Sequence, residues 1–361
     1  MVLSNKIYIF GAHSRAQTLG VYLTKLNTEL KIEAYLVDNE EPNPSSVDGV
    51  PVFDVGKDDY ELDVSYPVYI GTRGVYHQSI TDKLTSIGFD NIIPLTPALD
   101  NEMRNAFLKL YYNEINKEFI KFENLDSFAG KNTSNTVSIY VIKSVYDKLH
   151  DSKYPVTDHK VDLQVGADLT ETPIAAITDN SGDNISSRNK QFCELTGLYW
   201  IWKNGNEDIV GLEHYRRHFI LEDDWLDKFV SSDIDVILPT PLYVGPSLAE
   251  NYRNRHVASD FDYMMQVMKE IHPDDYESAK GFLEETAIYS PCNMFIMKKS
   301  ILNEFCEWLF PILFAVADHI GEREDTYQNR YPGFMSERLL SYYFNHNSNK
   351  YKLAYCDKVF L

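Results

Sequence analysis

Hydrophobic and polar positions follow two periods along the chain, one typical of strands and one typical of helices. Short apolar runs of strand length stand at Lys6–Phe10, Ile32–Val37 and Val68–Gly71. The first run ends in a glycine turn and leads into a helical pattern that continues to Leu26. Strands that alternate with helices in this order are typical of an α/β unit with a parallel sheet. We therefore predict a Rossmann-like domain over residues 1–98.

The turn after the first strand lacks the glycines that a dinucleotide site needs. Only Gly11 and the distant Gly20 remain of a G-x-G-x-x-G pattern, so we expect no NAD. Asp38 ends the second strand, where an acid either holds a ribose hydroxyl or simply caps the strand. With its G-V-P-V turn at 49–52, this half resembles the small domain that precedes sugar O- and N-acyltransferases. A docking domain with an empty site is the alternative.

Beyond residue 98 the pattern becomes polar and helical, and then rich in Ser, Asn, Gly and Thr. We predict a helical linker over 99–133 and a second domain over 134–361. In that domain the alternating stretch Thr136–Val141 predicts a core strand. Apolar and aromatic side chains recur at three- and four-residue steps over 189–204, which predicts a helix with one buried face. The run Asp208–Leu212 predicts the strand that follows it.

Charge and cysteine spacing exclude several kinds of function. A formal net charge of −20 would repel the phosphates of DNA or RNA, so we expect no nucleic-acid partner. The four cysteines form no C-x-x-C pair, which supports neither a zinc site nor a disulfide framework. The most apolar run, Phe305–Val316, is too short to span a bilayer and predicts a buried helix. We expect a cytoplasmic protein without a transmembrane segment, with the inner face of the membrane as an alternative place of action.

Five polar or charged side chains follow the predicted strand 208–212 directly: Glu213, His214, Tyr215, Arg216 and Arg217. In open α/β sheets, ligands bind at the carboxyl ends of the strands. So many polar groups at one strand end would be costly to bury for packing alone. We therefore predict a ligand site there.

Three stretches in this region carry a family resemblance: G-D-N-I-S-x-x-N from Gly182, C-E-L-T-G-L-Y-W-I-W-K-N from Cys193 and G-L-E-H-Y-R-R-H-F from Gly211. They resemble the signature of DUF4422, a bacterial domain found in capsular and exopolysaccharide gene products. The resemblance continues through residues 293–297, 306–310 and 330–339, and covers roughly 134–350. That domain is similar to GT-A glycosyltransferases, and some members are linked to galactofuranosyl transfer. The resemblance implies a GT-A-like domain with a mixed central sheet.

The resemblance also implies a reaction and its ligands. A hexose, with galactofuranose as one candidate, would pass from a UDP-sugar to a glycan or lipid-linked glycan acceptor with inversion, in cell-surface polysaccharide synthesis. Contact with a polysaccharide assembly complex and self-association into a homo-oligomer stay open. The donor-binding residues that we predict are Lys143, Asp183, Asn184, Asn189, Glu213, His214, Tyr215, Arg216, Arg217, Asn293 and Arg338.

The strand end also raises the question of a metal ion. GT-A enzymes commonly hold Mn²⁺ or Mg²⁺ against the donor diphosphate with an Asp-x-Asp at a strand end, and here that position reads Glu213-His214-Tyr215. Either Glu213 and His214 bind the metal in an altered form, or Arg216 and Arg217 neutralise the diphosphate directly.

For the base that accepts the acceptor's proton, the candidates are Glu337 and Asp260. Glu337 follows a Tyr-Pro-Gly loop at the start of a predicted helix, and an ion pair with Arg338 or Arg330 is the structural alternative. Asp260 follows His256 at a four-residue step, for which a surface pair is the alternative. We predict that His256 contacts the acceptor.

Two other functions remain open at this stage. A non-catalytic sensor or scaffold that binds a nucleotide sugar would explain the missing Asp-x-Asp. An NAD-dependent sugar oxidoreductase or epimerase would use the first domain, but a Tyr-x-x-x-Lys pair is not evident at the expected place.

Overall fold

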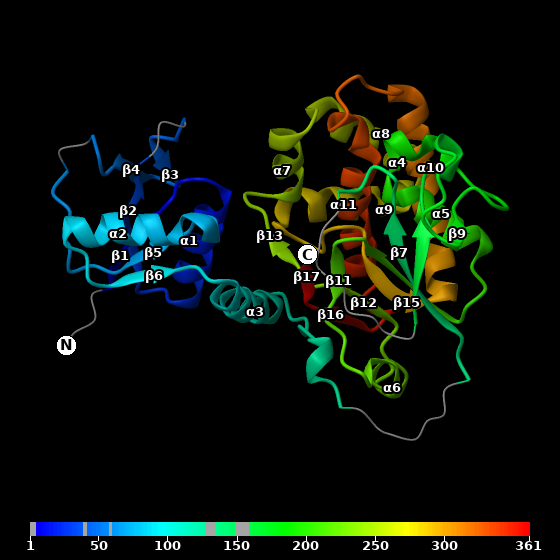
Figure 1. Ribbon diagram of the computed structural model, residues 1–361, viewed down its shortest axis with the longest axis horizontal. Coiled ribbons are helices and arrows are strands. Elements are labelled where there is room, and N and C mark those ends of the chain that lie inside the picture. Colours follow the sequence, from blue (N-terminus) through cyan, green and yellow to red (C-terminus); the bar gives the residue numbers. More distant parts are fainter. Residues whose placement is uncertain (1–4, 39–41, 58–59, 127–133, 149–158) are drawn as a thin grey trace. The chain divides into compact units, whose positions relative to one another are not determined.

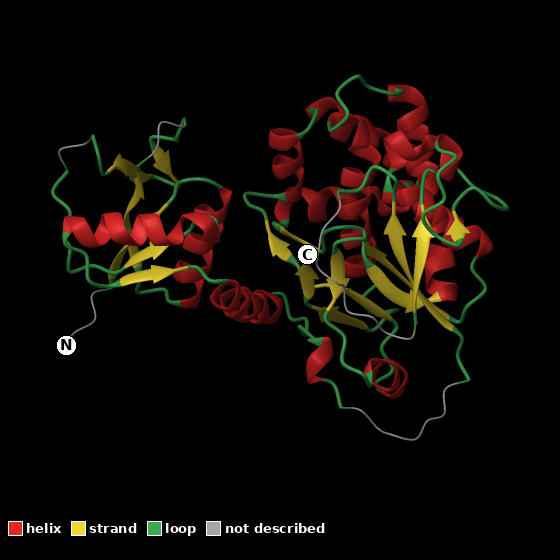
Figure 2. Ribbon diagram, in the orientation of Figure 1, coloured by secondary structure: helices red, strands yellow, loops and turns green. Residues whose placement is uncertain are grey.

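The computed structural model describes residues 5–38, 42–57, 60–126, 134–148 and 159–361 (Figure 1). The chain divides into two compact units, Met1–Phe119 and Ile120–Leu361. Each unit combines helices with its own sheet, as Figure 2 shows by colour. The prediction of an α/β protein is confirmed.

The first unit is built on a six-stranded sheet in the order β3-β4-β2-β1-β5-β6. All pairs are parallel except β3 with β4, and β1 lies in the middle of the sheet. Tyr8, Phe10, Leu36 and Ile70 from these strands are buried in one apolar core. The elements are β1 (Lys6–Phe10), α1 (Ser14–Leu26), β2 (Lys31–Val37), β3 (Ser46–Val47), β4 (Val50–Asp54), β5 (Val68–Ile70), η1 (Gly74–Tyr76), α2 (His77–Ile87), β6 (Ile92–Pro94) and α3 (Pro97–Glu114).

Helix α3 belongs to this first unit, whereas the sequence led us to predict a helical linker from residue 99. It packs against α1, with the rings of Tyr22 and Phe107 4.9 Å apart between centroids. The Thr96 hydroxyl caps its start by accepting from the Leu99 N–H. The apolar face of α3 is therefore part of the core of the first unit. The polar, helical sequence pattern alone did not show that this face packs against α1.

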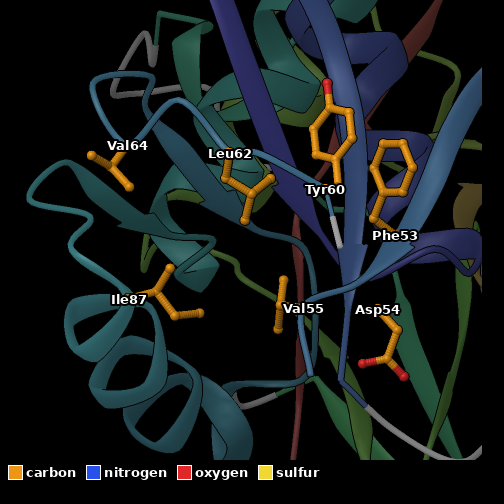
Figure 3. Close-up of a pocket in the computed structure, with 7 residues that line it drawn as sticks. All are labelled: Phe53, Asp54, Val55, Tyr60, Leu62, Val64 and Ile87. Atoms are coloured by element: carbon orange, nitrogen blue, oxygen red, sulfur yellow. The ribbon is translucent and has the colours of Figure 1, made fainter. Parts of the chain in front are cut away.

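A small cavity of about 210 Å³ lies in the first unit (Figure 3). Its lining is apolar apart from Asp54 and the Tyr60 hydroxyl, and the rings of Phe53 and Tyr60 stack at 4.0 Å. The carboxylate of Asp54 accepts from the Gly56 N–H at 2.9 Å and pairs with Lys57 at 3.3 Å. Asp54, the one charged side chain among the described residues that line this cavity, is thus already engaged.

The second unit is built on a nine-stranded mixed sheet. Its main order is β16-β12-β15-β10-β7-β8-β9, and β11 and β17 extend it beside β10. β15 runs antiparallel between β10 and β12, whereas β10, β7, β8 and β9 are parallel. The predicted mixed central sheet is therefore confirmed. The strands are β7 (Val137–Lys143), β8 (Lys160–Gln164), β9 (Ile177–Thr178), β10 (Ile209–His214), β11 (Arg217–Phe219), β12 (Val236–Pro239), β15 (Phe295–Lys298), β16 (Leu353–Cys356) and β17 (Lys358–Phe360).

Helices flank this sheet (Figure 1). They are α4 (Asn189–Phe192), α5 (Glu194–Asn204), α6 (Trp225–Ser231), α7 (Leu248–Arg255), α8 (Ala258–Ile271), α9 (Pro273–Glu285), α10 (Lys299–Ile320) and α11 (Tyr331–His346). Short 3-10 turns stand at η2 (Phe122–Asn124), η3 (Ala167–Leu169), η4 (Ser186–Arg188) and η5 (Gln328–Arg330), and β13 (Leu242–Tyr243) pairs with β14 (Ile288–Tyr289).

One helix in the described part of the chain, α10, is long and apolar enough to cross a membrane by length and composition alone. Within its most apolar window, 61% is buried inside the protein. Leu309 and Leu313 on this helix are fully buried, and α10 packs against α8 and α11. The buried helix that we predicted from Phe305–Val316 is thus part of a longer core helix.

Candidate active site

A cavity of about 210 Å³ opens where β10 ends and β15 begins. β15 is antiparallel to β10, so the turn before β15 lies at the carboxyl end of β10. The cavity is lined by Cys193, Glu194, His214, Arg217, Cys292, Tyr327, Arg330, Gly333, Phe334 and Glu337. These side chains come from β10, β11, α5, the turn before β15, η5 and α11. The cavity therefore stands at the edge of the sheet where ligands bind in open α/β folds.

Strand alternation decides which polar side chains of β10 reach the cavity. The strand runs to His214. Glu213 therefore lies within the strand, whereas we had predicted that it follows the strand's end. Successive side chains of a strand point to opposite faces. His214 lines the cavity, whereas Glu213 is fully buried away from it.

The Glu213 carboxylate is held by three partners of its own. Its Oε2 atom lies 2.8 Å from Lys160 Nζ and 2.8 Å from His218 Nδ1, and its Oε1 accepts from the Phe219 N–H at 2.8 Å. The Lys160 and Glu213 side chains are only 2% and 0% exposed. These contacts make Glu213 a buried structural carboxylate that ties β10 to β8 and β11.

The predicted helix 189–204 is broken at Cys193, which has a φ of 47° and separates α4 from α5. Residues with a side chain adopt such a positive φ only at a cost of about 1–3 kcal/mol, and such strain clusters at functional sites. Asn189 holds the break, because its side-chain amide donates to the Cys193 carbonyl at 2.8 Å. The break lets both Cys193 and Glu194 line the cavity.

A second strained turn precedes β15. Cys292 and Asn293 both have a positive φ, 79° and 50°, and both come before the strand, which begins at Phe295. The Cys292 N–H donates to Glu337 Oε1 at 2.6 Å, and the Cys292 carbonyl accepts from His214 Nε2 at 2.6 Å. The buried Asn293 amide donates to Glu194 Oε1 at 2.8 Å. One dipeptide thus positions three side chains of the cavity.

Four charged side chains line this cavity: Glu194, Glu337, Arg217 and Arg330. Within the described ranges, none of the four forms an ion pair with another residue. The Arg217 guanidinium lies beside the Phe360 ring at 5.3 Å, and Arg330 donates from Nε to Cys193 Sγ at 3.2 Å. Charges held apart in this way are available to a polar ligand.

Burial shifts the proton affinities of the groups in the cavity. Desolvation raises the pKa of the Glu337 carboxyl, and Glu194 raises it further, against opposing contributions from Arg338, Arg217 and the Cys292 N–H. Desolvation lowers the pKa of His214, so this imidazole is neutral and donates from Nε2. Burial also raises the pKa of Cys193 and of Cys292 to about 11, which keeps both thiols protonated.

Two of the rings that line the cavity, Phe334 and Tyr327, pack with His256, which lies outside the lining. His256 stacks on Phe334 at 4.0 Å between centroids, and the Tyr327 ring lies 5.1 Å from Phe334. Tyr327 is 53% exposed. Burial lowers the pKa of His256 to about 4, so the stack is uncharged at neutral pH. His256 follows the end of α7 and Asp260 lies in α8, so the two residues do not share a helix.

Asp260 lies outside the cavity lining. It sits buried in the first turn of α8, with Oδ1 2.5 Å from the Arg323 guanidinium. Of the two carboxylates predicted as the base, only Glu337 lines the cavity.

The structure brings His214, Arg217 and Glu337 into the cavity lining and leaves the other predicted donor residues elsewhere. Lys143 pairs with Asp162 at 2.6 Å, and the buried Arg338 donates to the Phe334 carbonyl at 2.8 Å. Exposed Asp183 accepts from the Tyr199 hydroxyl at 3.1 Å. Asn184 accepts from the Ser186 N–H, and the Arg216 guanidinium lies 5.3 Å from the Tyr215 ring.

The strand end does not fit a metal ion. The Glu213 carboxylate contacts Lys160, His218 and the Phe219 N–H inside the protein, and His214 Nε2 already donates to a carbonyl. Among the residues that the structure describes, no three His, Cys, Asp or Glu side chains lie close enough together to hold a metal. Glu213 and His214, which we predicted to bind Mn²⁺ or Mg²⁺ together, therefore project from opposite faces of β10.

Several residues of the cavity were missed from the sequence, chiefly Glu194, Arg330 and Phe334. A signal for two of them was present. Arg330, Gly333, Phe334 and Glu337 are spaced as one face of a helix, and all four line the cavity. Glu194 carried no such signal, because the break at Cys193 interrupts the helix that the periodic pattern predicts as continuous.

The fold and this cavity define an α/β protein with a polar cavity at the carboxyl edge of its mixed sheet. Residues 144–348 match the family described as "Domain of unknown function (DUF4422)". The chain belongs to that family. A comparison with curated protein sequences gave no match.

Solved structures show a related fold. A structure of WbbM, described as a bifunctional glycosyltransferase in its apo state, is 25% identical with a TM-score of 0.54. The alignment covers 63% of this chain and 45% of that one, so this chain corresponds to less than half of WbbM. Two further matches are the mannosyltransferase Ktr4p from S. cerevisiae (12% identity, 75% of this chain and 82% of that one, TM-score 0.28) and core-mannan synthase A from Aspergillus fumigatus in a Mn/GDP form (11%, 94% and 70%, 0.21). Their TM-scores are too low to carry an argument.

Proposed function

We propose that this protein is a hexosyltransferase that moves a sugar from a UDP-sugar to a glycan or lipid-linked glycan acceptor. The observation that carries the proposal is the cavity with four separated charges at the carboxyl end of β10. Two carboxylates can accept from sugar hydroxyls, and two guanidinium groups can bind phosphate oxygens. The likeness to WbbM supports the same class of reaction. Capsular or exopolysaccharide synthesis at the inner face of the membrane, with galactofuranose as one candidate sugar, follows from the family resemblance.

In the proposed reaction Glu337 is the base. Its carboxylate takes the proton of the acceptor hydroxyl, and the hydroxyl oxygen attacks the anomeric carbon with inversion. The bond from that carbon to the phosphate oxygen breaks, and its electrons leave with UDP. The Cys292 N–H holds one oxygen of Glu337 and leaves the other oxygen for the acceptor. A raised pKa suits this role, because a base is most effective when its pKa approaches the working pH.

Glu194 supports the sugar in this proposal. Its Oε1 is fixed by Asn293, and its other oxygen is left to accept from a sugar hydroxyl. A cavity of about 210 Å³ is of the scale of one sugar ring and not of a whole nucleotide sugar. The uridine would therefore lie outside the cavity.

The test is transfer from a panel of UDP-sugars, measured as UDP release with and without glycan acceptors. We expect release with at least one donor, and faster release when an acceptor is present. If no donor gives release and calorimetry detects no binding of any UDP-sugar, the proposal is wrong.

A further inference from the structure

The positive charge of the cavity comes from two arginines that lie 113 positions apart, a separation obtained as 330 minus 217. Arg217 stands at the start of β11, and Arg330 ends η5 just before α11. Both guanidinium groups lower the pKa of His214, so both lie within electrostatic reach of the same imidazole. Arg217 is held by the Phe360 ring and Arg330 by Cys193 Sγ, and neither arginine forms an ion pair with any residue that the structure describes.

The strand end beside these arginines does not supply the ligands of a divalent cation. Glu213 is directed to Lys160 and His218, on the opposite face of β10 from the cavity. The two carboxylates that do line the cavity each have one oxygen engaged, since Glu337 Oε1 accepts from the Cys292 N–H and Glu194 Oε1 accepts from the Asn293 amide. A divalent cation would serve the same purpose as Arg217 and Arg330, which is to neutralise the negative charge that develops on the leaving diphosphate.

We infer that Arg217 and Arg330 bind the diphosphate of the donor and that transfer proceeds without a divalent cation. This inference rests on the proposed function. As the bond between the anomeric carbon and the β-phosphate oxygen breaks, its electron pair stays on UDP, and the two guanidinium groups stabilise the added negative charge. The acceptor oxygen forms the new bond to carbon, and its proton passes to Glu337. All atoms and charges are balanced by donor, acceptor and protein.

The site thereby assigns a role to Arg330, which the sequence had offered only as an ion-pair partner of Glu337. The Arg330 side chain is exposed to solvent and lines the cavity, so an incoming phosphate can reach it. Its Nε atom is used on Cys193, which leaves the two terminal nitrogens of the guanidinium free to form a bidentate contact with phosphate.

Calorimetric titration of the full chain with UDP tests this directly. One titration contains EDTA and the other MnCl₂, and free Mn²⁺ is followed in parallel by electron paramagnetic resonance. We expect a Kd that agrees within a factor of about 3 between the two conditions, and no uptake of Mn²⁺ when UDP is added. Transfer from the active donor should likewise persist in EDTA.

The variants Arg217→Gln and Arg330→Gln should each weaken UDP binding by about tenfold or more, because each removes a charge-assisted contact. Arg330→Lys keeps the charge without the planar fork and should give an intermediate Kd. Arg253→Gln is the matched control: this arginine pairs with Glu250 and Asp262 on the surface of α7, and its loss should leave the Kd unchanged. Thermal melting of each variant checks that it is folded.

The outcomes separate the two proposals. Binding or transfer that requires Mn²⁺, or folded arginine variants that bind UDP like the wild type, would overturn the inference and leave the transferase proposal standing. Absence of UDP binding in both conditions, together with no transfer from any donor, would remove both.

Discussion

The backbone N–H of Cys292 donates to the Glu337 carboxylate at 2.6 Å, although 45 positions separate the two residues. Cys292 is held at a φ of 79°, and Glu337 stands in the second turn of α11. Burial of Glu337 favours its protonated form, and this hydrogen bond favours the ionised form. The contact therefore fixes one oxygen of the predicted base and moderates its raised pKa.

Glu337→Gln should remove the catalytic base and leave the folded structure intact. The amide oxygen can still accept from the Cys292 N–H, so the turn before β15 stays in place. We expect turnover to fall by about 10²–10⁴-fold with donor affinity little changed. Steady-state rates of UDP release measure this. Unchanged turnover in the folded variant would show that Glu337 is not the base.

The same variant should change how stability depends on pH. The folded-state pKa of Glu337 is raised, so folded protein binds this proton more tightly than unfolded protein does. Its contribution to stability is then present below the unfolded pKa and is lost as the pH rises through the folded pKa. Relative to wild type, Glu337→Gln should therefore gain stability between pH 4 and pH 7. Urea denaturation at both pH values measures the difference, and a constant difference would contradict the shift.

Asn293 should be a positioning residue that acts through Glu194. Asn293→Gly removes the amide but permits the φ of 50°, whereas Asn293→Ala removes the amide and also strains the turn by about 1–2 kcal/mol. If the amide orients Glu194, both variants should lose turnover equally, by about tenfold, while only the alanine variant loses additional stability. Turnover that follows stability instead would indicate a purely structural role.

Glu213→Gln should damage the fold more than the site. The variant leaves the buried Lys160 charge without its partner, which costs about 3–5 kcal/mol. Asp262→Asn breaks a surface pair instead and should cost about 1 kcal/mol or less. Denaturant unfolding gives both values. A stable Glu213→Gln variant without activity would instead restore the donor-binding or metal-binding role that we predicted from the sequence.

Tyr327→Ala should weaken acceptor binding through the ring stack beside the cavity. The stack of His256, Phe334 and Tyr327 offers uncharged faces to a neutral sugar, because the pKa of His256 is lowered to about 4. We expect the acceptor KM to rise about tenfold, with donor hydrolysis unchanged and Tyr327→Phe close to wild type. The acceptor KM should also stay constant between pH 5 and 8. A pH-dependent KM, or an unaltered KM in the alanine variant, would exclude this stack as the acceptor site.

Local patterns in the sequence were sufficient for the class of fold and for part of the site. Strand-length apolar runs predicted the α/β architecture, and the charged segment 213–217 lies at the sheet edge where the cavity opens. His214, Arg217 and Glu337 line the cavity as members of the predicted set. Period-two and period-3.6 patterns report burial of one face, and that information is local to each element.

The faces and partners of individual side chains depended on long-range contacts. Because β10 ends at His214, two residues beyond the predicted end, alternation sends Glu213 into the protein and His214 to the cavity. Cys193 and Cys292 adopt positive φ angles that their residue types do not favour, and each has a long-range contact: Arg330 Nε donates to Cys193 Sγ, and the Cys292 N–H donates to Glu337. Glu194 and Arg330 meet in one cavity across 136 positions, 330 minus 194, and no local period records such a meeting. The pattern of residues thus determines which elements form, and the packing of those elements determines which charges remain unpaired.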